Sequence, residues 1–206
     1  MSKLRMPKLK GVIPAMITPF TAKGEIDDEA AGKLIDHFIK SGVHGIMCCG
    51  STGEAAALSR EERRHVVELT VQSVKGRVPV IAGTGTSGTK LATQLTQDAK
   101  EVGADAALVV TPFNLIPTEE GICEHYKTIA TQVDMPILVY NVPQATMVNV
   151  TPPLIARLVK EIDTMVGVKE SSGSISQIAE TIRLAGDEIA VLTGNDAGLY
   201  PDFLLG

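Results

Sequence analysis

Seven short apolar runs alternate with amphipathic stretches along the whole chain, and this rhythm constrains the fold more than any other feature. The runs are rich in β-branched residues, and most are bounded by glycine or proline. They lack alternating polar positions, which is typical of strands buried on both faces of a parallel sheet. The runs are Val12–Thr18, Gly45–Cys49, Val78–Gly83, Ala106–Thr111, Pro136–Tyr140, Met165–Lys169 and Ile189–Thr193.

The stretches between these runs carry helix signals. Ser59 followed by Glu62 has the spacing of a capping box, and Thr151 before Pro152 is a typical N-cap and first-turn pair. The predicted helices span Ile26–Ser41, Ser59 to about Lys75, Thr86–Val102, Thr118–Gln132, Pro152–Glu161 and Ser174–Leu184, and a last helix starts near Ala197.

Strand starts recur about every 25 to 35 residues, which indicates successive βα units within a single domain over residues 1–206. A doubly wound sheet and a (β/α)8 barrel both fit this pattern. The even rhythm favours the barrel, and so does the lack of a full dinucleotide-binding fingerprint, since Gly83–Gly88 matches only half of one.

The length of the chain is short for a barrel. A (β/α)8 barrel typically has about 250 residues, whereas this chain has 206 and ends at Gly206, where an eighth strand would begin. We therefore predict an α/β fold, a (β/α)8 TIM barrel that is incomplete here, with about seven βα units and the eighth strand missing.

Composition excludes several classes of partner. Hydrophobic residues make up 44% of the chain, enough for one core. The net charge is -5, the basic residues are scattered and aromatic residues are only 3%, so no nucleic-acid partner is expected. No apolar run reaches the roughly 18 residues of a membrane span. The basic N-terminus lacks the apolar core of a signal peptide. We predict a cytoplasmic protein without a membrane partner.

The cysteines and histidines do not form a metal-binding pattern. Three cysteines, Cys48, Cys49 and Cys123, lack metal-type spacing and are expected to be buried free thiols in a reducing compartment. The histidines are dispersed and are expected at the surface, without a metal; they are His37, His44, His65 and His125.

Lys169 is the first candidate for chemistry, because it alone among the lysines closes an apolar strand. At the carboxyl end of a barrel strand it would point toward the site face. Partial burial would lower the pKa of its amine and make the amine a nucleophile toward carbonyl carbons. The alternative is a side chain that extends to solvent or pairs with Glu170.

Three further segments end at the same predicted edge. Tyr140 closes the fifth run and either relays protons or serves as an ordinary core tyrosine. Ser51 and Thr52, between two glycines, form a turn that either offers donors to a carboxylate or phosphate or simply caps the strand. Gly194 permits close approach of a ligand, and Asp196 is expected to be a helix N-cap.

Together these segments resemble the dihydrodipicolinate synthase / N-acetylneuraminate lyase family of pyruvate-dependent class I aldolases. The resemblance covers nearly the whole chain and rests on the order and spacing of five motifs. They are Gly11–Phe20, Gly50–Glu54, Ala82–Gly85, Tyr140–Pro143 and Gly167–Glu170.

The resemblance implies a role for each candidate residue. Lys169 matches the lysine that forms a Schiff base with the keto group of pyruvate, and Tyr140 matches the proton-relaying tyrosine. Ser51 and Thr52 match the pair that binds the pyruvate carboxylate, and Gly194 matches a glycine lining the site. No metal or organic cofactor is implied, and a homotetramer is usual in the family.

Two positions depart from the synthase pattern. Ala145 stands where an arginine usually binds the carboxylate of aspartate semialdehyde, and an alanine cannot form that clamp. Phe113 and Asn114 stand where the synthase usually has two tyrosines, one of them lent across a dimer interface. The Gly-Ser-Thr-Gly-Glu form of the turn also resembles the lyase branch.

The resemblance therefore implies a carbon–carbon lyase that joins pyruvate, or another 2-oxo acid, to an aldehyde, as 4-hydroxy-tetrahydrodipicolinate synthase does in lysine biosynthesis. An N-acetylneuraminate or 2-keto-3-deoxy sugar acid aldolase is the alternative within enzymes. An inactive fragment, or an assembly piece with open sheet edges, is the alternative of another class.

Overall fold

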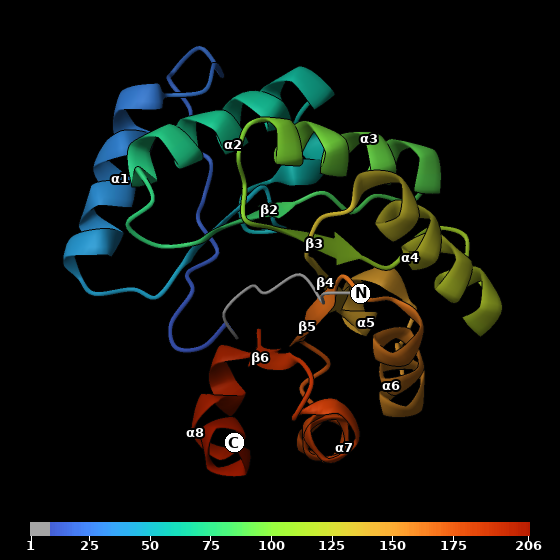
Figure 1. Cartoon of the computed structure of the whole chain (residues 1–206). Coiled ribbons are helices and arrows are strands. Elements are labelled where there is room, and N and C mark those ends of the chain that lie inside the picture. The colour runs from blue at the N-terminus through green and yellow to red at the C-terminus, as the bar shows by residue number, and fades with distance from the viewer. Residues whose placement is uncertain (1–8) are drawn as a thin grey trace.

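The strands form one open parallel sheet that follows the order of the chain (Figure 1). The computed structural model describes residues 9–206; residues 1–8, which hold most of the N-terminus considered above for a signal peptide, lie outside that range. The described sheet has six strands in the order β1-β2-β3-β4-β5-β6. They are β1 (Ile46–Cys48), β2 (Val80–Gly83), β3 (Ala106–Val110), β4 (Ile137–Asn141), β5 (Met165–Glu170) and β6 (Ala190–Thr193).

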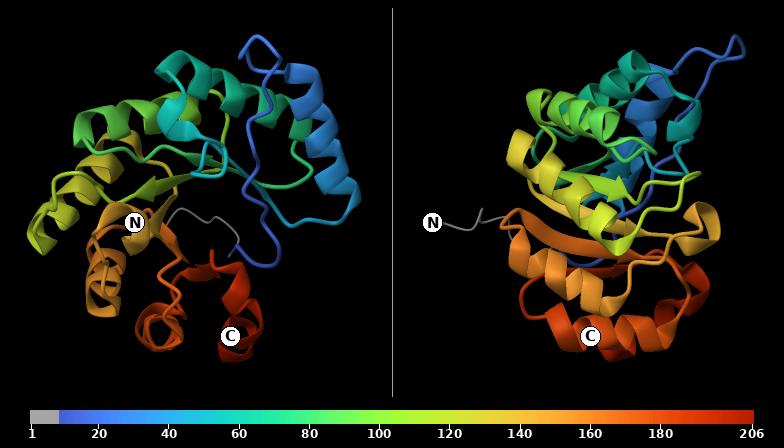
Figure 2. Two further views of the ribbon diagram at one scale, coloured as in Figure 1. Left: turned by 180° about the vertical axis from the view of Figure 1, so that it is seen from behind. Right: turned by 90° about the vertical axis from the view of Figure 1, so that its right-hand side faces the viewer.

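Helices cover the outer, convex side of the curled sheet (Figures 1 and 2). This strand order and one-sided cover confirm the barrel architecture over the doubly wound sheet, whose strand order reverses and whose two faces are both covered. The helices are α1 (Asp28–Lys40), α2 (Arg60–Val74), α3 (Thr89–Glu101), α4 (Glu119–Val133), α5 (Pro143–Thr146), α6 (Pro152–Glu161), α7 (Ile175–Ala185) and α8 (Leu199–Leu205), with 3-10 turns η1 (Ala55–Ala57) and η2 (Asp196–Gly198).

The prediction of a first strand at Val12–Thr18 is wrong. It makes one parallel bridge, between Ala15 and Met47, rather than a full strand. The Met16 amide donates to the Met47 carbonyl at 2.8 Å, and the Met47 amide donates to the Pro14 carbonyl at 3.0 Å. Pro14 has no N–H to donate, which limits the ladder to these few bonds. The segment still lies beside β1 and occupies the place of a strand.

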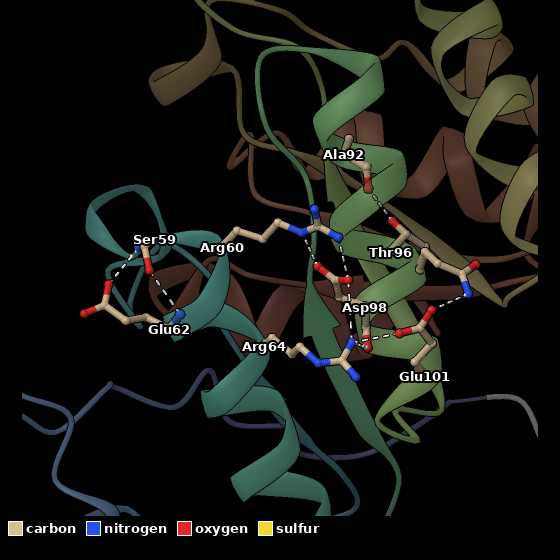
Figure 3. Close-up of polar contacts among 9 residues, drawn as sticks. Ser59, Arg60, Glu62, Arg64, Ala92, Thr96, Asp98 and Glu101 are labelled. Atoms are coloured by element: carbon tan, nitrogen blue, oxygen red, sulfur yellow. Dashed lines mark hydrogen bonds and ion pairs between the residues drawn. The ribbon is translucent and has the colours of Figure 1, made fainter.

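The helix signals are confirmed with two corrections. Ser59 and Glu62 form the predicted capping box (Figure 3). Thr151 is the N-cap of α6, but its side chain makes no capping bond. Pro152 and the following proline fill the first two helical positions and offer no N–H. The last helix is preceded by η2, whose N-cap is Asn195 rather than the predicted Asp196.

An ion-pair cluster joins α2 to α3 on the outside of the fold (Figure 3). The Arg60 guanidinium donates to both oxygens of Asp98, at 2.6 and 2.8 Å. Arg64 donates to Glu101 at 2.9 Å. Arg60 holds the pKa of the Asp98 carboxyl below its usual value. The bidentate geometry fixes the relative position of the two helices.

Alternation along the strands separates two sides of the sheet. On β4, Leu138 and Tyr140 belong to the inner cluster, whereas Ile137 and Val139 pack outward against the helices. The register between β4 and β5 shifts by one residue after Met165, so that Leu138 pairs with Gly167 and Tyr140 with Lys169. This irregularity places Lys169 on the inner side, because a one-residue shift exchanges the two faces of a strand.

The cysteines fit the prediction and one histidine does not. Cys48, Cys49 and Cys123 are buried free thiols. His125, expected at the surface, is buried on α4. Its ring stacks edge-on with Tyr126, and its Nδ1 lies 2.9 Å from the Thr89 hydroxyl. This apolar packing explains why burial lowers the His125 pKa to about 4.

The lowered pKa of His125 leads us to expect a loss of stability in acid. Its pKa is lower in the folded chain than in the unfolded chain, so the unfolded chain binds an extra proton between about pH 6.5 and pH 4. The free energy of unfolding should therefore fall across this window, by up to roughly 3 kcal/mol from this group. Urea titrations near neutral pH and in mild acid should show a smaller loss for His125→Gln than for the parent chain. The exposed control His37→Gln should behave as the parent does, and an equal loss in His125→Gln would contradict the assignment.

Candidate active site

Lys169 and Tyr140 meet on the inner side of the sheet at its carboxyl edge. They are register partners on β5 and β4. The Lys169 amine lies 4.5 Å from the centroid of the Tyr140 ring. Its Nζ is also 3.8 Å from the Met47 sulfur on β1. The structure therefore brings together the two residues that the sequence marked as nucleophile and proton relay.

The surroundings of Lys169 disfavour its charge. Burial lowers the pKa of the amine, and the opposing influence is the negative charge of Asp196 in η2. Among residues 9–206 no carboxylate forms an ion pair with the amine, so the pairing with Glu170 is not observed. The side chain is also partly buried rather than extended into solvent. A thioether and an aromatic face are weak partners for an ammonium compared with a carboxylate. The amine thus has the protonation tendency that a nucleophile needs.

Gly194 is required by close packing against Lys169. A Cβ at this position would lie 2.6 Å from the Lys169 Cε and 2.1 Å from the Ser171 hydroxyl oxygen. The Gly194 amide donates to the Glu170 carbonyl at 2.8 Å, which ties the end of β6 to the end of β5. Gly194 therefore borders the Lys169 side chain and leaves room for it.

Ser51 and Thr52 lie in the turn after β1, on the same carboxyl edge of the sheet. Both are exposed, and their amides and hydroxyls donate no hydrogen bond to any described residue. The buried Thr18 hydroxyl fixes the turn by donating to the Gly53 carbonyl at 2.7 Å. Donors without partners on a fixed turn suit a carboxylate. In the described part of the chain, no hydrogen bond joins Ser51 or Thr52 to Lys169.

The two departures from the synthase pattern lie in the segments that follow β3 and β4. Phe113 is half-buried and Asn114 is exposed, with a φ of 71°. Ala145 is exposed on α5, directly after β4.

Sequence reasoning missed four residues around this site. Met47 was read only as part of a strand, although its inward position follows from the alternation of β1. The others are Asn141 and Glu170, which directly follow Tyr140 and Lys169, and Ser171. The Ser171 hydroxyl is buried without a partner and faces Gly194. Asn141 and Glu170 could have been found because each directly follows a candidate residue at the end of one of two neighbouring strands.

Residues 9–206 contain no group of three or more histidine, cysteine, aspartate or glutamate side chains that could hold a metal ion. In the same part of the chain, no helix combines the length and the apolarity needed to cross a membrane.

The geometry can now be compared with known proteins. The sequence model of the Dihydrodipicolinate synthetase family matches residues 8–206. The chain belongs to this family. A 4-hydroxy-tetrahydrodipicolinate synthase of Thermodesulfovibrio yellowstonii is 50% identical over 187 residues, which are 91% of this chain and 64% of that protein. The chain thus spans slightly less than two thirds of that relative's length.

Solved structures in this family have the same fold. Dihydrodipicolinate synthase from Aquifex aeolicus superimposes with a TM-score of 0.92 at 43% identity, covering 95% of this chain and 67% of that one. The enzyme of Acinetobacter baumannii, solved with pyruvate, gives a TM-score of 0.93 at 39% identity, with coverage of 96% and 68%. The resemblance inferred from the motifs is confirmed at the level of family and fold.

The packing at Gly194 generates a prediction that needs no substrate. In Gly194→Ala the new methyl group must displace Lys169 or Ser171, so the reactivity of the amine should change. Competitive labelling with acetic anhydride over a range of pH, read by mass spectrometry, should give a shifted curve for Lys169. In the control Gly88→Ala a Cβ meets no atom within 4 Å, and the curve should be that of the parent. An unchanged curve in Gly194→Ala would contradict the close contact.

Proposed function

We propose that this chain carries the Schiff-base site of a carbon–carbon lyase that joins pyruvate to an aldehyde, of the 4-hydroxy-tetrahydrodipicolinate synthase type. The observation that carries the proposal is the partly buried Lys169 amine, with its lowered pKa, above the ring of Tyr140. Family membership and the names of the relatives support the same conclusion.

The chemistry follows from an amine next to a phenol. The neutral Lys169 amine attacks the keto carbon of pyruvate, and the resulting carbinolamine loses water to give an iminium ion. The iminium withdraws electrons, so a proton leaves C3 and an enamine forms. The enamine carbon then bonds to the aldehyde carbon, and water releases the product from the lysine. Tyr140 is positioned to pass protons to and from the departing water and the new alkoxide.

Residues at the carboxyl edge of the sheet are proposed to orient the substrate. Ser51 and Thr52 would donate to the pyruvate carboxylate, which directs the keto carbon toward Lys169. Gly194 would leave space for pyruvate beside the amine. The pyruvate complex of the Acinetobacter baumannii enzyme supports pyruvate as the ligand of this fold.

The aldehyde is the less determined substrate. The names of the relatives favour aspartate semialdehyde, the aldehyde that the synthase joins to pyruvate. That reaction is a step of lysine biosynthesis. Ala145 favours an aldehyde without a carboxylate at that place, as in the sugar acid aldolases. We propose the synthase reaction first and the sugar acid aldolase reaction as the second candidate.

The remaining properties are proposed with the function. The reaction as written uses only the lysine amine and needs no metal or organic cofactor. The buried free thiols support a reducing compartment, which we take to be the cytoplasm. A homo-oligomer, a tetramer as the resemblance implies, is the proposed assembly.

Trapping the Schiff base tests the proposal directly. Incubation with pyruvate and borohydride should add the mass of one reduced pyruvate at Lys169. The rate should rise with pH and level off below the pH expected for an ordinary lysine, because burial lowers the pKa of this amine. Lys169→Gln should give no adduct, and the exposed control Lys160→Gln should be trapped as the parent is. An unmodified Lys169 in the parent chain would refute the proposal.

The melting temperature separates an active site from an inactive fragment. Pyruvate that binds only the folded chain must raise the melting temperature. A cooperative transition shifted upward by pyruvate is expected, with no shift in Lys169→Gln. A broad transition that pyruvate leaves unchanged would favour the fragment.

Ala145 gives a test of the aldehyde. Ala145→Arg should increase the use of aspartate semialdehyde relative to an uncharged aldehyde by roughly 10- to 100-fold in kcat/KM, the usual range for one charge-assisted hydrogen bond. The Ala145→Gln variant, of similar length but without charge, serves as the control. Equal ratios in both variants would mean that this position does not contact the aldehyde.

A further inference from the structure

Behind Lys169 and Tyr140 lies a second pair of register partners, Asn141 and Glu170. They directly follow the two site residues on β4 and β5, and they pair with each other across the sheet. Because side chains alternate along a strand, Asn141 and Glu170 point outward, toward the helices, where Lys169 and Tyr140 point inward. Both outward residues are 0% exposed.

The Glu170 carboxylate is buried without an ion pair in the described structure. Four contacts from uncharged groups hold it instead. The Asn141 amide lies 3.1 and 2.9 Å from its two oxygens, the Gln177 amide donates at 2.8 Å and the Ser172 backbone amide at 2.7 Å. A buried carboxylate is costly unless it is paired or fully hydrogen-bonded. Here three different elements supply the donors, so a shift of any of them breaks a bond.

Asn141 extends the network to the loop before α6. Its side-chain oxygen accepts from the Val150 amide at 2.9 Å, and its amide also lies 2.9 Å from the Asn149 side-chain oxygen. The Asn141 carbonyl accepts from the Ser171 amide at 2.8 Å. The network thus joins the ends of β4 and β5 to the loops that follow both strands.

The amine of Lys169 lacks any comparable restraint of its own. The partners of the amine itself are the Tyr140 ring and the Met47 sulfur, which bind an ammonium weakly. The position of the amine is therefore set by where the backbone of β5 places its Cα. That backbone is held from the other side by Glu170, one residue further along the strand.

We propose that Asn141 and Glu170 are a positioning pair, which acts through the strand ends to hold the Lys169 amine over the Tyr140 ring. The inference rests on the function proposed above for Lys169, and it adds two residues that do not contact the substrate. In this pair the Asn141 amide donates to the Glu170 carboxylate. Replacing only one of the two by its isostere would therefore set donor against donor or acceptor against acceptor.

Isosteric exchanges test this match. Glu170→Gln turns one acceptor into a donor, which faces the amide of Asn141 and that of either Gln177 or Ser172. Asn141→Asp sets two carboxylates against each other, and such a pair retains one shared proton at a higher pH than a lone carboxyl does. The double variant Asn141→Asp/Glu170→Gln exchanges the two partners and restores one amide facing one carboxylate.

Trapping with pyruvate and borohydride should resolve the four proteins. Each single variant should be trapped on the order of 10- to 100-fold more slowly than the parent near neutral pH, the cost of a misplaced reacting group. Asn141→Asp should recover as the pH falls and the shared proton binds, in contrast to the parent, which slows in acid. The double variant should be trapped faster than either single variant, because the contact between positions 141 and 170 is restored while one of the Ser172 and Gln177 donors still faces an amide. Single variants trapped at the parental rate, or a double variant slower than both, would overturn the proposal.

A second readout separates this inference from the proposed function. Competitive acetic anhydride labelling of Lys169 needs no substrate, and its pH curve should shift in both single variants and return in the double variant. If the parent forms no pyruvate adduct, the proposed function fails, while the labelling curves still decide whether the pair positions the amine. Unshifted curves in both single variants would overturn the positioning role whatever the trapping result.

Asp98→Asn is the matched control for a simple loss of stability. Asp98 is also a largely buried carboxylate held by side-chain bonds, but it lies between α2 and α3. All variants are compared at the same distance below their own melting temperatures. Asp98→Asn should lower the melting temperature and leave the Lys169 labelling curve in place. A shift as large as that of Glu170→Gln would attribute the effect to general destabilisation and overturn the proposal.

Discussion

The register between β4 and β5 is the constraint on which the site depends. Alternation gives each strand an inner and an outer side, and the shift after Met165 determines which residues of β5 fall on each. With this register Lys169 faces Tyr140 inside the curl and Glu170 faces Asn141 outside it. The proposed catalytic residues and the proposed positioning pair are therefore adjacent residues of the same two strands, and a change of one residue in register would exchange the sides that they face.

Two buried ionisable groups lie one residue apart and are treated in opposite ways. Lys169 is partly buried beside an aromatic ring and a thioether, and burial disfavours the charged amine and lowers its pKa. Glu170 is surrounded by amide donors, which stabilise a carboxylate without bringing a cation close to the lysine. A guanidinium in place of these amides would satisfy Glu170 equally well, but its positive charge would further depress the amine pKa from a short distance. The neutral network holds the strand while adding no cation beside the nucleophile.

The sequence was sufficient for the repeating units and insufficient for the contacts between them. Unbroken apolar runs and capping signals predicted β1 to β6 and most helices to within a few residues, because these depend on local chemistry. The bridge at Ala15 and the burial of His125 depend on neighbours far along the chain, and no local pattern reports them. Lys169, Tyr140 and Gly194 were candidates from their positions at strand ends, and the family resemblance supplied the roles expected of them. Glu170 and Asn141 were not, since a charged residue after a strand usually faces solvent, and only the pairing of β4 with β5 reveals that both are buried.

The distribution of the site along the chain has its own consequence. Lys169, Tyr140 and Gly194 all come from β4 to β6 and their loops, a contiguous part of the sheet, and Gln177 of α7 completes the network behind them. Only Met47 and the turn of Ser51 and Thr52 come from β1, on the far side of the curl. The reactivity of the amine is therefore a property of three neighbouring strands that hydrogen-bond to one another directly. The proposed orientation of a pyruvate carboxylate by Ser51 and Thr52 would depend instead on how tightly the whole sheet curls, because their turn follows β1, which is not hydrogen-bonded to β5. Anything that changes the curl should alter the affinity for a 2-oxo acid before it alters the protonation of Lys169.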